Sequence, residues 1–464
     1  MTGPGNQFHS LAKIVGETNT SAEPQALAAF AIDGHLPSVV VRPSNAEEIA
    51  EILRFCGAEK LAAIPAGGAT KLRMGAAPVR YDVALVTTRL ERITAYDPGD
   101  LTVSVEAGAR LGEITHLLSE HRQLLPLAVP FLGQATVGGT VASGIDSPLR
   151  QLYGTVRDFL LGIEFVTGDG IHAKSGARVV KNVAGYDLHK LFIGSLGTLV
   201  VITRLNFKTF PVPEASGAFL ATFASESGVL ELLRKIRKSP LRGSALEVFS
   251  PTLSALFARR MAQTAPDRTL PSPWLSGSAW ALAAHFGGND RVMHRYKSEL
   301  ESMAGAAGAN GSTLLPEDAR AALWDHTREM VPLLLDESPA AMIVRVSALP
   351  NRLGDVFAAA QQSGDRHELP VAILARAAGV AYIAFLPNQS NGEIGGRLAQ
   401  AARELADAAA EAQGFSFVAW CPPELKGRLS LWGKERTDLP LMRNVKQAFD
   451  PGNTLSPGRF MGGI

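Results

Sequence analysis

The stretch Gly133-Gln-Ala-Thr-Val-Gly-Gly-Thr-Val-Ala-Ser-Gly144 places four glycines among small residues. Because glycine lacks a Cβ atom, such density is typical of backbone that turns sharply or closely approaches another group. The spacing of Gly133, Gly138, Gly139 and Gly144 follows neither a helical nor a strand period. Two interpretations are open on this stretch alone. It is either a small-residue loop in an alanine-rich chain or a cradle of backbone N–H groups for a phosphate-bearing cofactor.

A second glycine-rich turn lies earlier in the chain, at the end of an expected strand. Residues 37–43 form a β-branched run between prolines, and residues 45–55 have early acids and apolar positions at helical spacing. Residues 61–65 then predict another strand, which leads directly into Ala66-Gly-Gly-Ala-Thr-Lys71. Cofactor phosphates commonly lie at the ends of strands in such α/β units. The two turns together, residues 66–70 and 133–144, therefore favour a pyrophosphate held from two sides.

The chain is long enough, at 464 residues, for two or three domains. Pro211-Val-Pro213 is the clearest boundary, since two prolines end a long β run and the composition changes after it. Beyond it, alternating strands and helices indicate an α+β layer, so the predicted fold class is α+β. The expected segments are an N-terminal extension (1–36), a cofactor domain (37–213), a cap or subunit-interface domain (214–430) and a C-terminal segment returning to the cofactor domain (431–464).

The composition excludes several classes of function. With 45 basic and 44 acidic residues the net charge is +1, whereas nucleic-acid binding usually needs a basic excess. Cys56 and Cys421 are the only cysteines, too few for an iron–sulfur cluster and without a disulfide pattern. The N-terminus lacks a signal-peptide pattern, and no run is long and apolar enough for a membrane span. We therefore expect a cytoplasmic protein that meets the inner membrane only through its partners.

Several familiar catalytic motifs are absent. There is no Gly-x-Gly-x-x-Gly fingerprint, and Lys71 has the wrong spacing for a Walker loop. The ten histidines show no metal-ligand spacing, so no metal site is predicted. Ser143 lacks the Gly-x-Ser-x-Gly elbow of a hydrolase nucleophile. Lys181-Asn-Val-Ala-Gly-Tyr-Asp187 is dense in polar groups and reads either as a site loop or as a surface turn with Asp187 capping a helix.

Five motifs occur in the order seen in flavoproteins of the vanillyl-alcohol-oxidase/cresol-methylhydroxylase (PCMH) type, and the chain resembles that family over residues 37–213. They are Pro65-Ala-Gly-Gly-Ala-Thr, Ala135-Thr-Val-Gly-Gly, Tyr153-Gly-Thr-Val-Arg-Asp, Gly185-Tyr-Asp-Leu-His-Lys-Leu-Phe and Gly194-Ser-Leu-Gly-Thr-Leu-Val-Val-Ile-Thr. The tail from Met442 to Phe460 resembles the C-terminus of FAD-linked 2-hydroxy-acid dehydrogenases. Within this group, the form Val-Val-Lys-Asn-Val-Ala-Gly-Tyr-Asp with Gly-Ser-Leu-Gly-Thr is most similar to the smaller flavoprotein subunits of bacterial glycolate oxidases.

The resemblance implies a PCMH-type FAD-binding domain of two subdomains, a ferredoxin-like α+β cap and non-covalent FAD. Residues 66–70 and 133–144 would lie on the pyrophosphate, and residues 197–202 beside the adenine and ring system. No cysteine or histidine stands where the flavin would be covalently attached. The implied FAD contacts are Ala66, Gly67, Gly68, Ala69, Thr70, Gly133, Ala135, Thr136, Gly138, Gly139, Ser143, Gly144, Gly154, Gly197, Val201 and Ile202.

Two departures from the family concern the substrate. Larger catalytic subunits of the family carry Gly-Ser-Glu-Gly-Thr, where this chain has Leu196 in place of the acid. They also carry a metal-binding His-x-Gly-Asp-Gly-Asn-x-His segment, whereas the comparable residues 371–380 are apolar here. A 2-hydroxy acid needs a cation for its carboxylate and a base for its hydroxyl proton. Arg345, Arg376 and His285 are the candidates, and a structural role is the alternative for each.

The expected function is that of the FAD-binding subunit of a glycolate oxidase (glycolate dehydrogenase), with a larger flavoprotein subunit and an iron–sulfur subunit as partners. Two alternatives stay open at this point. One is a stand-alone FAD dehydrogenase for another 2-hydroxy acid or an alcohol. The other is a non-catalytic flavin-binding assembly subunit.

Overall fold

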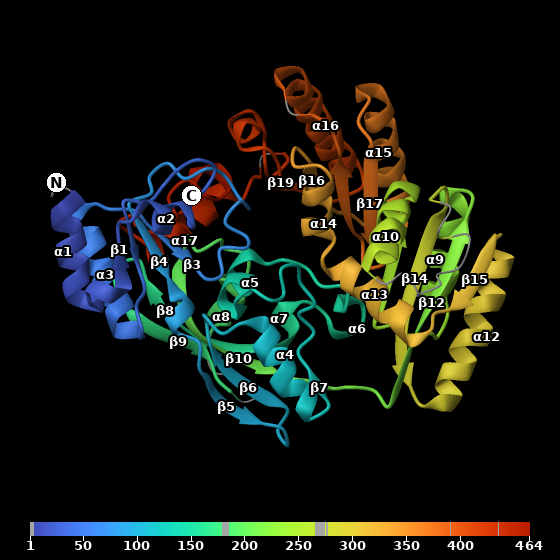
Figure 1. Ribbon diagram of the computed structural model, residues 1–464, viewed down its shortest axis with the longest axis horizontal. Helices are drawn as coiled ribbons and strands as arrows, with labels where there is room; N and C mark the ends of the chain where they lie inside the picture. The colour runs from blue at the N-terminus through green and yellow to red at the C-terminus, as the bar shows by residue number, and fades with distance from the viewer. Residues whose placement is uncertain (1–3, 179–184, 265–273, 275–276, 390, 435) are drawn as a thin grey trace. The chain divides into compact units, whose positions relative to one another are not determined.

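The computed structural model describes residues 4–178, 185–264, 274, 277–389, 391–434 and 436–464. The chain forms two compact units. The first unit comprises Met1–Asp146, Thr155–Val212 and Arg436–Ile464, and the second comprises Ser147–Gly154 and Pro213–Glu435. Figure 1 shows the path of the chain with its helices and strands labelled. Both units combine helices with sheets, which confirms the predicted α+β class.

The first unit contains a four-stranded sheet in the order β1-β2-β4-β3. Both β2 and β3 run parallel to β4. Helix α3 begins where the Asn45 side chain accepts a hydrogen bond from the Glu48 amide at 2.8 Å, which satisfies one of the unpaired N–H groups of the first turn. Its apolar stripe packs with α1 and the sheet into one core, and α1 and α3 lie side by side in Figure 1. The elements are α1 (Pro4–Val15), β1 (Thr20–Ser21), β2 (Val39–Val41), α3 (Ala46–Glu59), β3 (Ala63–Ala66) and β4 (Val83–Val86).

An antiparallel five-stranded sheet completes the first unit, in the order β5-β6-β10-β8-β9. The strands are β5 (Ile93–Asp97), β6 (Thr102–Glu106), β8 (Leu160–Thr167), β9 (His172–Gly176) and β10 (Val200–Lys208), with β7 (Gln123–Leu124) and β11 (Phe210–Pro211) forming a separate pair. The remaining helices are α2 (Pro24–Ala28), α4 (Leu111–Glu120), α5 (Val137–Ser143), α7 (Val156–Phe159), α8 (Leu188–Leu191) and α17 (Leu439–Phe449), with short 3-10 helices at 17–19, 87–89 and 461–463.

The glycine-rich stretch from Gly133 to Gly144 is not the continuous loop that its spacing suggests, because helix α5 occupies residues 137–143. The Thr136 hydroxyl caps this helix by accepting a hydrogen bond from the Gly139 amide at 3.3 Å. Gly144 ends it in the left-handed region, at φ 60°. Glycine, threonine and valine are poor helix formers, so burial of Val137, Thr140 and Val141 here overrides intrinsic propensity.

The second unit is built on one eight-stranded sheet in the order β15-β12-β14-β13-β17-β18-β16-β19, antiparallel at every pair. Its strands are β12 (Ala215–Phe223), β13 (Ala245–Phe249), β14 (Trp280–Gly288), β15 (Gly311–Leu314), β16 (Met342–Ser347), β17 (Val371–Arg376), β18 (Val380–Phe385) and β19 (Phe415–Trp420). Its helices are α6 (Arg150–Tyr153), α9 (Glu226–Lys238), α10 (Pro251–Thr264), α12 (Asp290–Ala306), α13 (Glu317–Arg328), α14 (Met330–Glu337), α15 (Leu353–His367) and α16 (Gly392–Glu411), with 3-10 helices at 350–352 and 423–428.

Different helices cover the two faces of this sheet. Trp280 on β14 stacks on Phe357 of α15, and Phe286 stacks on Tyr296 of α12. His285, whose side chain points to the opposite face of β14, contacts Trp324 of α13 edge to face. The face that carries His285 is called the His285 face below. No helix among the described residues combines the length and the apolar character needed to cross a bilayer.

Candidate functional site

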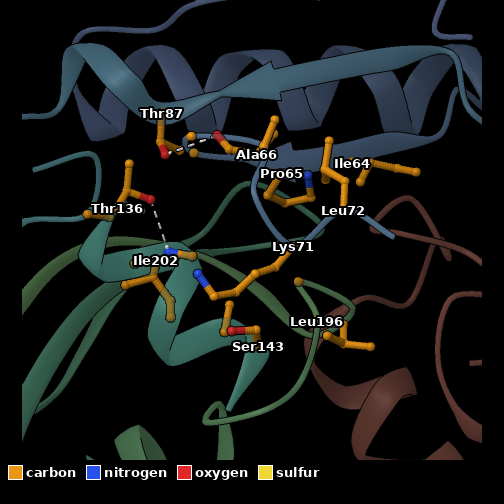
Figure 2. Close-up of a pocket in the computed structure, with 18 of the residues that line it drawn as sticks. Ile64, Pro65, Ala66, Lys71, Leu72, Thr87, Thr136, Ser143, Leu196 and Ile202 are labelled. Carbon is orange, nitrogen blue, oxygen red and sulfur yellow. Dashed lines mark hydrogen bonds between the residues drawn. The ribbon is translucent and has the colours of Figure 1, made fainter. Parts of the chain in front are cut away.

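One cavity of about 770 Å³ in the first unit, a volume that includes open solvent, is lined mainly by three segments that lie far apart in the sequence. They are the end of β3 with its following turn, helix α5 with its cap, and the start of β10 (Figure 2). The lining residues are Ile64, Pro65, Ala66, Gly67, Gly68, Ala69, Thr70, Lys71, Leu72, Thr87, Ala107, Thr136, Gly138, Gly139, Ala142, Ser143, Leu196, Gly197, Val200, Val201, Ile202 and Arg459.

Close backbone approach explains the glycines of the first turn. A Cβ atom on Gly67 would overlap the Thr136 hydroxyl, and one on Gly68 would overlap the backbone oxygen of Gln134. The two glycine-rich turns predicted from the sequence are therefore in direct contact. A side chain at either position would push the two turns apart.

The same turn presents backbone donors to the cavity. Within the described part of the chain, the N–H groups of Gly67, Gly68 and Ala69 find no acceptor. Consecutive N–H groups of this kind form a concave site with partial positive charge, which is suited to a phosphate group. The turn thus fits the diphosphate of FAD by the chemistry of its donors.

Glycines let helix α5 pack closely against the neighbouring segments of the first unit. The Gly138 amide donates to the Ala107 oxygen at 2.8 Å, and a Cβ atom at Gly138 would lie 2.6 Å from that of Ala107. The Leu196 amide in turn donates to the Ala142 oxygen at 2.8 Å, which ties the segment before β10 to the helix. Gly197 follows at φ 71°, with Pro65 packed beside it. These contacts bring the third segment to the cavity.

Most of the residues predicted to contact FAD line this cavity. They are Ala66, Gly67, Gly68, Ala69, Thr70, Thr136, Gly138, Gly139, Ser143, Gly197, Val201 and Ile202. The four others lie elsewhere: Gly133 has open space around its Cα, Ala135 is buried, Gly144 ends α5 against Gly194, and Gly154 follows α6 at φ 77°. Contact with FAD stays a prediction for all sixteen residues.

The sequence reasoning did not identify two charged residues of the lining. Lys71 directly follows the first turn, and Arg459 belongs to the Ser-Pro-Gly-Arg-Phe tail. Arg459 is 3% exposed, and its guanidinium donates to the oxygens of Leu72, Met74 and Ala76 at 2.6 to 2.9 Å. The position of Lys71 beside a glycine-rich turn was the available signal. For Arg459, the sequence predicted that the C-terminal segment returns to the cofactor domain, but no signal placed it near residues 72–76.

The predicted site loop at residues 181–187 lies largely outside the described residues. Of its described part, Tyr186 is 90% exposed. Asp187 stands at the start of α8 without a side-chain capping bond and pairs instead with Lys190 at 2.8 Å. This Lys190 contact lowers the pKa of Asp187. The choice between a site loop and a surface turn stays a prediction.

The second unit carries a row of polar side chains on the His285 face of its sheet. Register pairs Glu247 with Arg376 across β13 and β17, and Arg345 with Tyr382 across β16 and β18. Directly opposed residues lie on the same face of an antiparallel sheet. These four side chains therefore extend the row from β14 across β13, β17, β18 and β16. Glu247 is fully buried and lies 3.5 Å from the Arg376 guanidinium, which also stands 5.2 Å from the Tyr382 ring centroid. Arg376 is thus fixed in place by an acid and an aromatic ring.

Arg345 has a different environment from Arg376. Its Nε atom is buried, yet the described residues provide no hydrogen-bond acceptor for it. Its neighbours across the sheet are Tyr382 and Phe417, neither of which carries a charge that could pair with it. Of the three predicted substrate residues, Arg345 is therefore the one whose charge the described protein leaves available to an anion.

His285 is held as a neutral ring. Its Nδ1 atom lies 2.5 Å from the Ser244 hydroxyl, and Trp324 covers one edge of the imidazole. Burial, together with the smaller effect of nearby Arg320, lowers the pKa of His285 to about 4, while Glu317 opposes the shift. A neutral imidazole offers no positive charge to a substrate carboxylate near pH 7.

The low pKa predicts a pH-dependent stability of the second unit. Since an unfolded histidine titrates near 6.5, the unfolded chain binds a proton at this site between about pH 6.5 and 4 that the folded chain does not bind. The free energy of unfolding should therefore fall as the pH falls through this window, by on the order of 3 kcal/mol in total. In urea titrations, His285→Gln should remove this slope, while exposed His294→Gln should keep it. Equal slopes in both variants would contradict the prediction.

Across the described ranges, no group of three or more His, Cys, Asp or Glu side chains is arranged to hold a metal ion.

Comparison with known families assigns both parts of the chain. Residues 37–175 match the FAD binding domain family, and residues 212–416 and 430–460 match the family of the C-terminal domain of FAD-linked oxidases. The second match covers more than half of the 464 residues.

Similar proteins of known name include two glycolate oxidase subunits. GlcD of Bacillus subtilis is 24% identical over 428 residues, which are 92% of this chain and 89% of GlcD. GlcE of Escherichia coli is 39% identical over 153 residues, 32% of this chain and 44% of GlcE. The mitochondrial D-2-hydroxyglutarate dehydrogenase of Danio rerio is 28% identical over 302 residues, 64% of this chain and 55% of that enzyme. The chain thus matches only about half the length of the last two relatives.

Two solved structures confirm the predicted PCMH-type fold. Substrate-bound p-cresol methylhydroxylase has a TM-score of 0.79 at 20% identity, covering 99% of this chain and 97% of that one. The 4-ethylphenol oxidase of Gulosibacter chungangensis has a TM-score of 0.76 at 17% identity, covering 98% and 96%. With both domain families matched, the chain belongs to the FAD-linked oxidases, and its cofactor is FAD.

Proposed function

We propose that the chain is the FAD-binding subunit of a multi-subunit glycolate oxidase, which converts glycolate to glyoxylate and passes the electrons to an iron–sulfur partner. The observation that carries the proposal is the glycine-built cavity, whose free N–H groups fit the diphosphate of non-covalent FAD. Likeness to both GlcD and GlcE supports the choice of glycolate and of a complex with a larger flavoprotein subunit.

The route of the electrons supports the need for a partner. Oxidation of glycolate to glyoxylate removes two electrons and two protons from the alcohol carbon and its hydroxyl group. FAD, when bound, supplies the two-electron acceptor. The two cysteines of the chain, Cys56 and Cys421, are both buried, and a cluster needs about four thiolates. A cluster that takes the electrons one at a time would therefore belong to another chain.

Arg345 is the proposed anchor for the substrate carboxylate. An arginine binds a carboxylate through two parallel hydrogen bonds, and burial of its Nε atom strengthens such a contact. Arg376 already faces Glu247, and His285 is neutral, so neither offers the same charge. Arg345 would bind and orient the acid in this proposal, without taking a proton from it.

Replacement of Arg345 by methionine should raise the KM of the reconstituted complex for glycolate more than it lowers kcat. Loss of a charge-assisted hydrogen bond costs about 1.5–3 kcal/mol, which is roughly a 10- to 100-fold change in affinity. Steady-state kinetics of the variant and of exposed Arg403→Met, on helix α16, would measure this. An unchanged KM in Arg345→Met would exclude Arg345 as the anchor.

The proposed function itself is tested by expressing the chain alone and together with its two proposed partners. Flavin absorbance, iron content and dye reduction should be measured with glycolate, D-lactate and D-2-hydroxyglutarate. We expect flavin in the isolated chain, and iron and full glycolate activity only in the complex. Full activity of the iron-free chain alone would overturn the proposal.

A second candidate is an FAD dehydrogenase that acts alone on another 2-hydroxy acid. The likeness to D-2-hydroxyglutarate dehydrogenase favours it. Activity of the isolated chain with D-2-hydroxyglutarate would support this candidate. A flavin-containing chain that is needed for the complex to form, but whose flavin no substrate reduces, would indicate a non-catalytic assembly subunit.

A further inference from the structure

Lys71 is a buried lysine that directly follows the glycine-rich turn of residues 66–70. It is 9% exposed, and its ammonium donates to the Thr70 hydroxyl at 3.2 Å and to the Pro130 oxygen at 3.5 Å. The Phe131 ring centroid lies 5.9 Å from the same nitrogen. Figure 2 shows the side chain extending into the cavity, on the side of Ser143 and Ile202. Lys71 and the turn residues 67–69 thus line the same cavity.

The charged side chains that line the cavity are all positive. Its described residues include the cations Lys71 and Arg459 but no aspartate or glutamate. Burial lowers the pKa of Arg459 to about 10, although Asp33 and Tyr81 act in the opposite direction. A cation in a region of low dielectric interacts strongly with a nearby negative charge. The lining therefore suits a ligand that carries full negative charge.

The two cations have separate tasks. The Arg459 guanidinium donates hydrogen bonds to the backbone oxygens of Leu72, Met74 and Ala76. Because these bonds hold the segment that follows Lys71, Arg459 is a positioning residue. Lys71 has a compact charge on a flexible stem, which is the form in which lysine contacts phosphate groups. The permanently ionised part of FAD is its diphosphate.

We infer that the Lys71 ammonium is the cationic partner of the FAD diphosphate, completing the site that the N–H groups of Gly67, Gly68 and Ala69 begin. The inference rests on FAD as the cofactor and is independent of which acid is oxidised. It adds a full charge to a site that is otherwise built from backbone dipoles.

The experiment uses the full chain freed of FAD, titrated with FAD, ADP and riboflavin at low and high salt. In Lys71→Met, the dissociation constants for FAD and for ADP should both rise roughly 10- to 100-fold, because a charge-assisted contact is lost. The riboflavin constant should stay unchanged, and the salt dependence of ADP binding should weaken. Lys71→Arg should restore part of the loss. Lys174→Met, at an exposed position on β9, should match the wild type.

Two results would overturn the inference. One is unchanged ADP binding in Lys71→Met, since Lys71 would then not contact the diphosphate. The other is an equal loss for riboflavin and ADP together with a lower unfolding midpoint, which would indicate that Lys71 only holds the segment containing Pro130. Neither measurement uses a substrate or a partner subunit, so an error in the proposed function leaves both readouts interpretable.

Discussion

Replacement of Gly68 by alanine is expected to abolish FAD binding by the first unit at micromolar cofactor. The added Cβ atom would overlap the backbone oxygen of Gln134, and backbone cannot rotate away as a flexible side chain can. The turn must therefore move away from residues 134–136, which carries the N–H groups of Gly67 and Gly68 out of place. Overpacking of this kind typically costs about 1–3 kcal/mol or more, and displacement of the phosphate donors adds to it. We expect FAD affinity to fall by at least about a hundredfold.

Absorbance of the purified protein in the visible flavin band and titration of the apo-protein with FAD would measure the effect, with circular dichroism to confirm that the variant folds. Gly396→Ala, on helix α16, is the matched control, because a Cβ atom there would meet open space and the backbone does not require glycine. Gly138→Val should resemble Gly68→Ala, since its side chain would collide with Ala107. At Gly139 only the Thr136 hydroxyl lies close, at 3.1 Å, so valine there should have a milder effect. Normal flavin content in Gly68→Ala would contradict the assignment of this turn to the diphosphate.

The elements that position the cofactor could be predicted from the sequence because local signals mark them. The prolines and β-branched residues of 37–43 correspond to β2, and the glycine-rich turn follows β3, which ends at Ala66, one residue later than expected. The family motifs then indicated which turns share one ligand. Helix α5 could not be predicted in this way, since its residues are poor helix formers and its stability comes from burial against Ala107.

The sequence also could not predict the contacts between segments that lie far apart in the chain. Arg459 reaches residues 72–76 only because the C-terminal segment returns to the first unit. Likewise, Glu247 meets Arg376 only through the register of two strands far apart in the chain. A single sequence carries no local signal for either pairing. The substrate candidates therefore could be named from the sequence, but their different environments could not.

Replacement of Lys446 by methionine should destabilise the first unit by about 3–5 kcal/mol, the cost typical of removing one partner from a buried ion pair. Lys446 and Asp450 are 7% and 1% exposed, and their charged atoms lie 2.5 Å apart. Burial lowers the pKa of Lys446, while Asp450 opposes the shift. The ammonium also donates to the oxygens of Thr198 and Leu455, both at 2.8 Å. Without the ammonium, the buried Asp450 carboxylate and the carbonyl groups of Thr198 and Leu455 each lose one hydrogen-bond donor.

The same substitution should weaken FAD binding, because Thr198 directly follows the cavity residue Gly197. The midpoint of thermal unfolding, recorded with and without FAD, separates the two effects. The double variant Lys446→Met with Asp450→Asn should recover part of the stability, since no unpaired charge is then buried. The carboxamide oxygen of the new side chain can still accept one of the amide bonds that Asp450 accepts from Thr454 and Leu455.

Exposed Lys434→Met is the control, because it breaks only the surface pair with Asp407 and should change stability by less than about 1 kcal/mol. If Lys446→Met were as mild as Lys434→Met, the buried pair would not be what secures the C-terminal segment to the cofactor site.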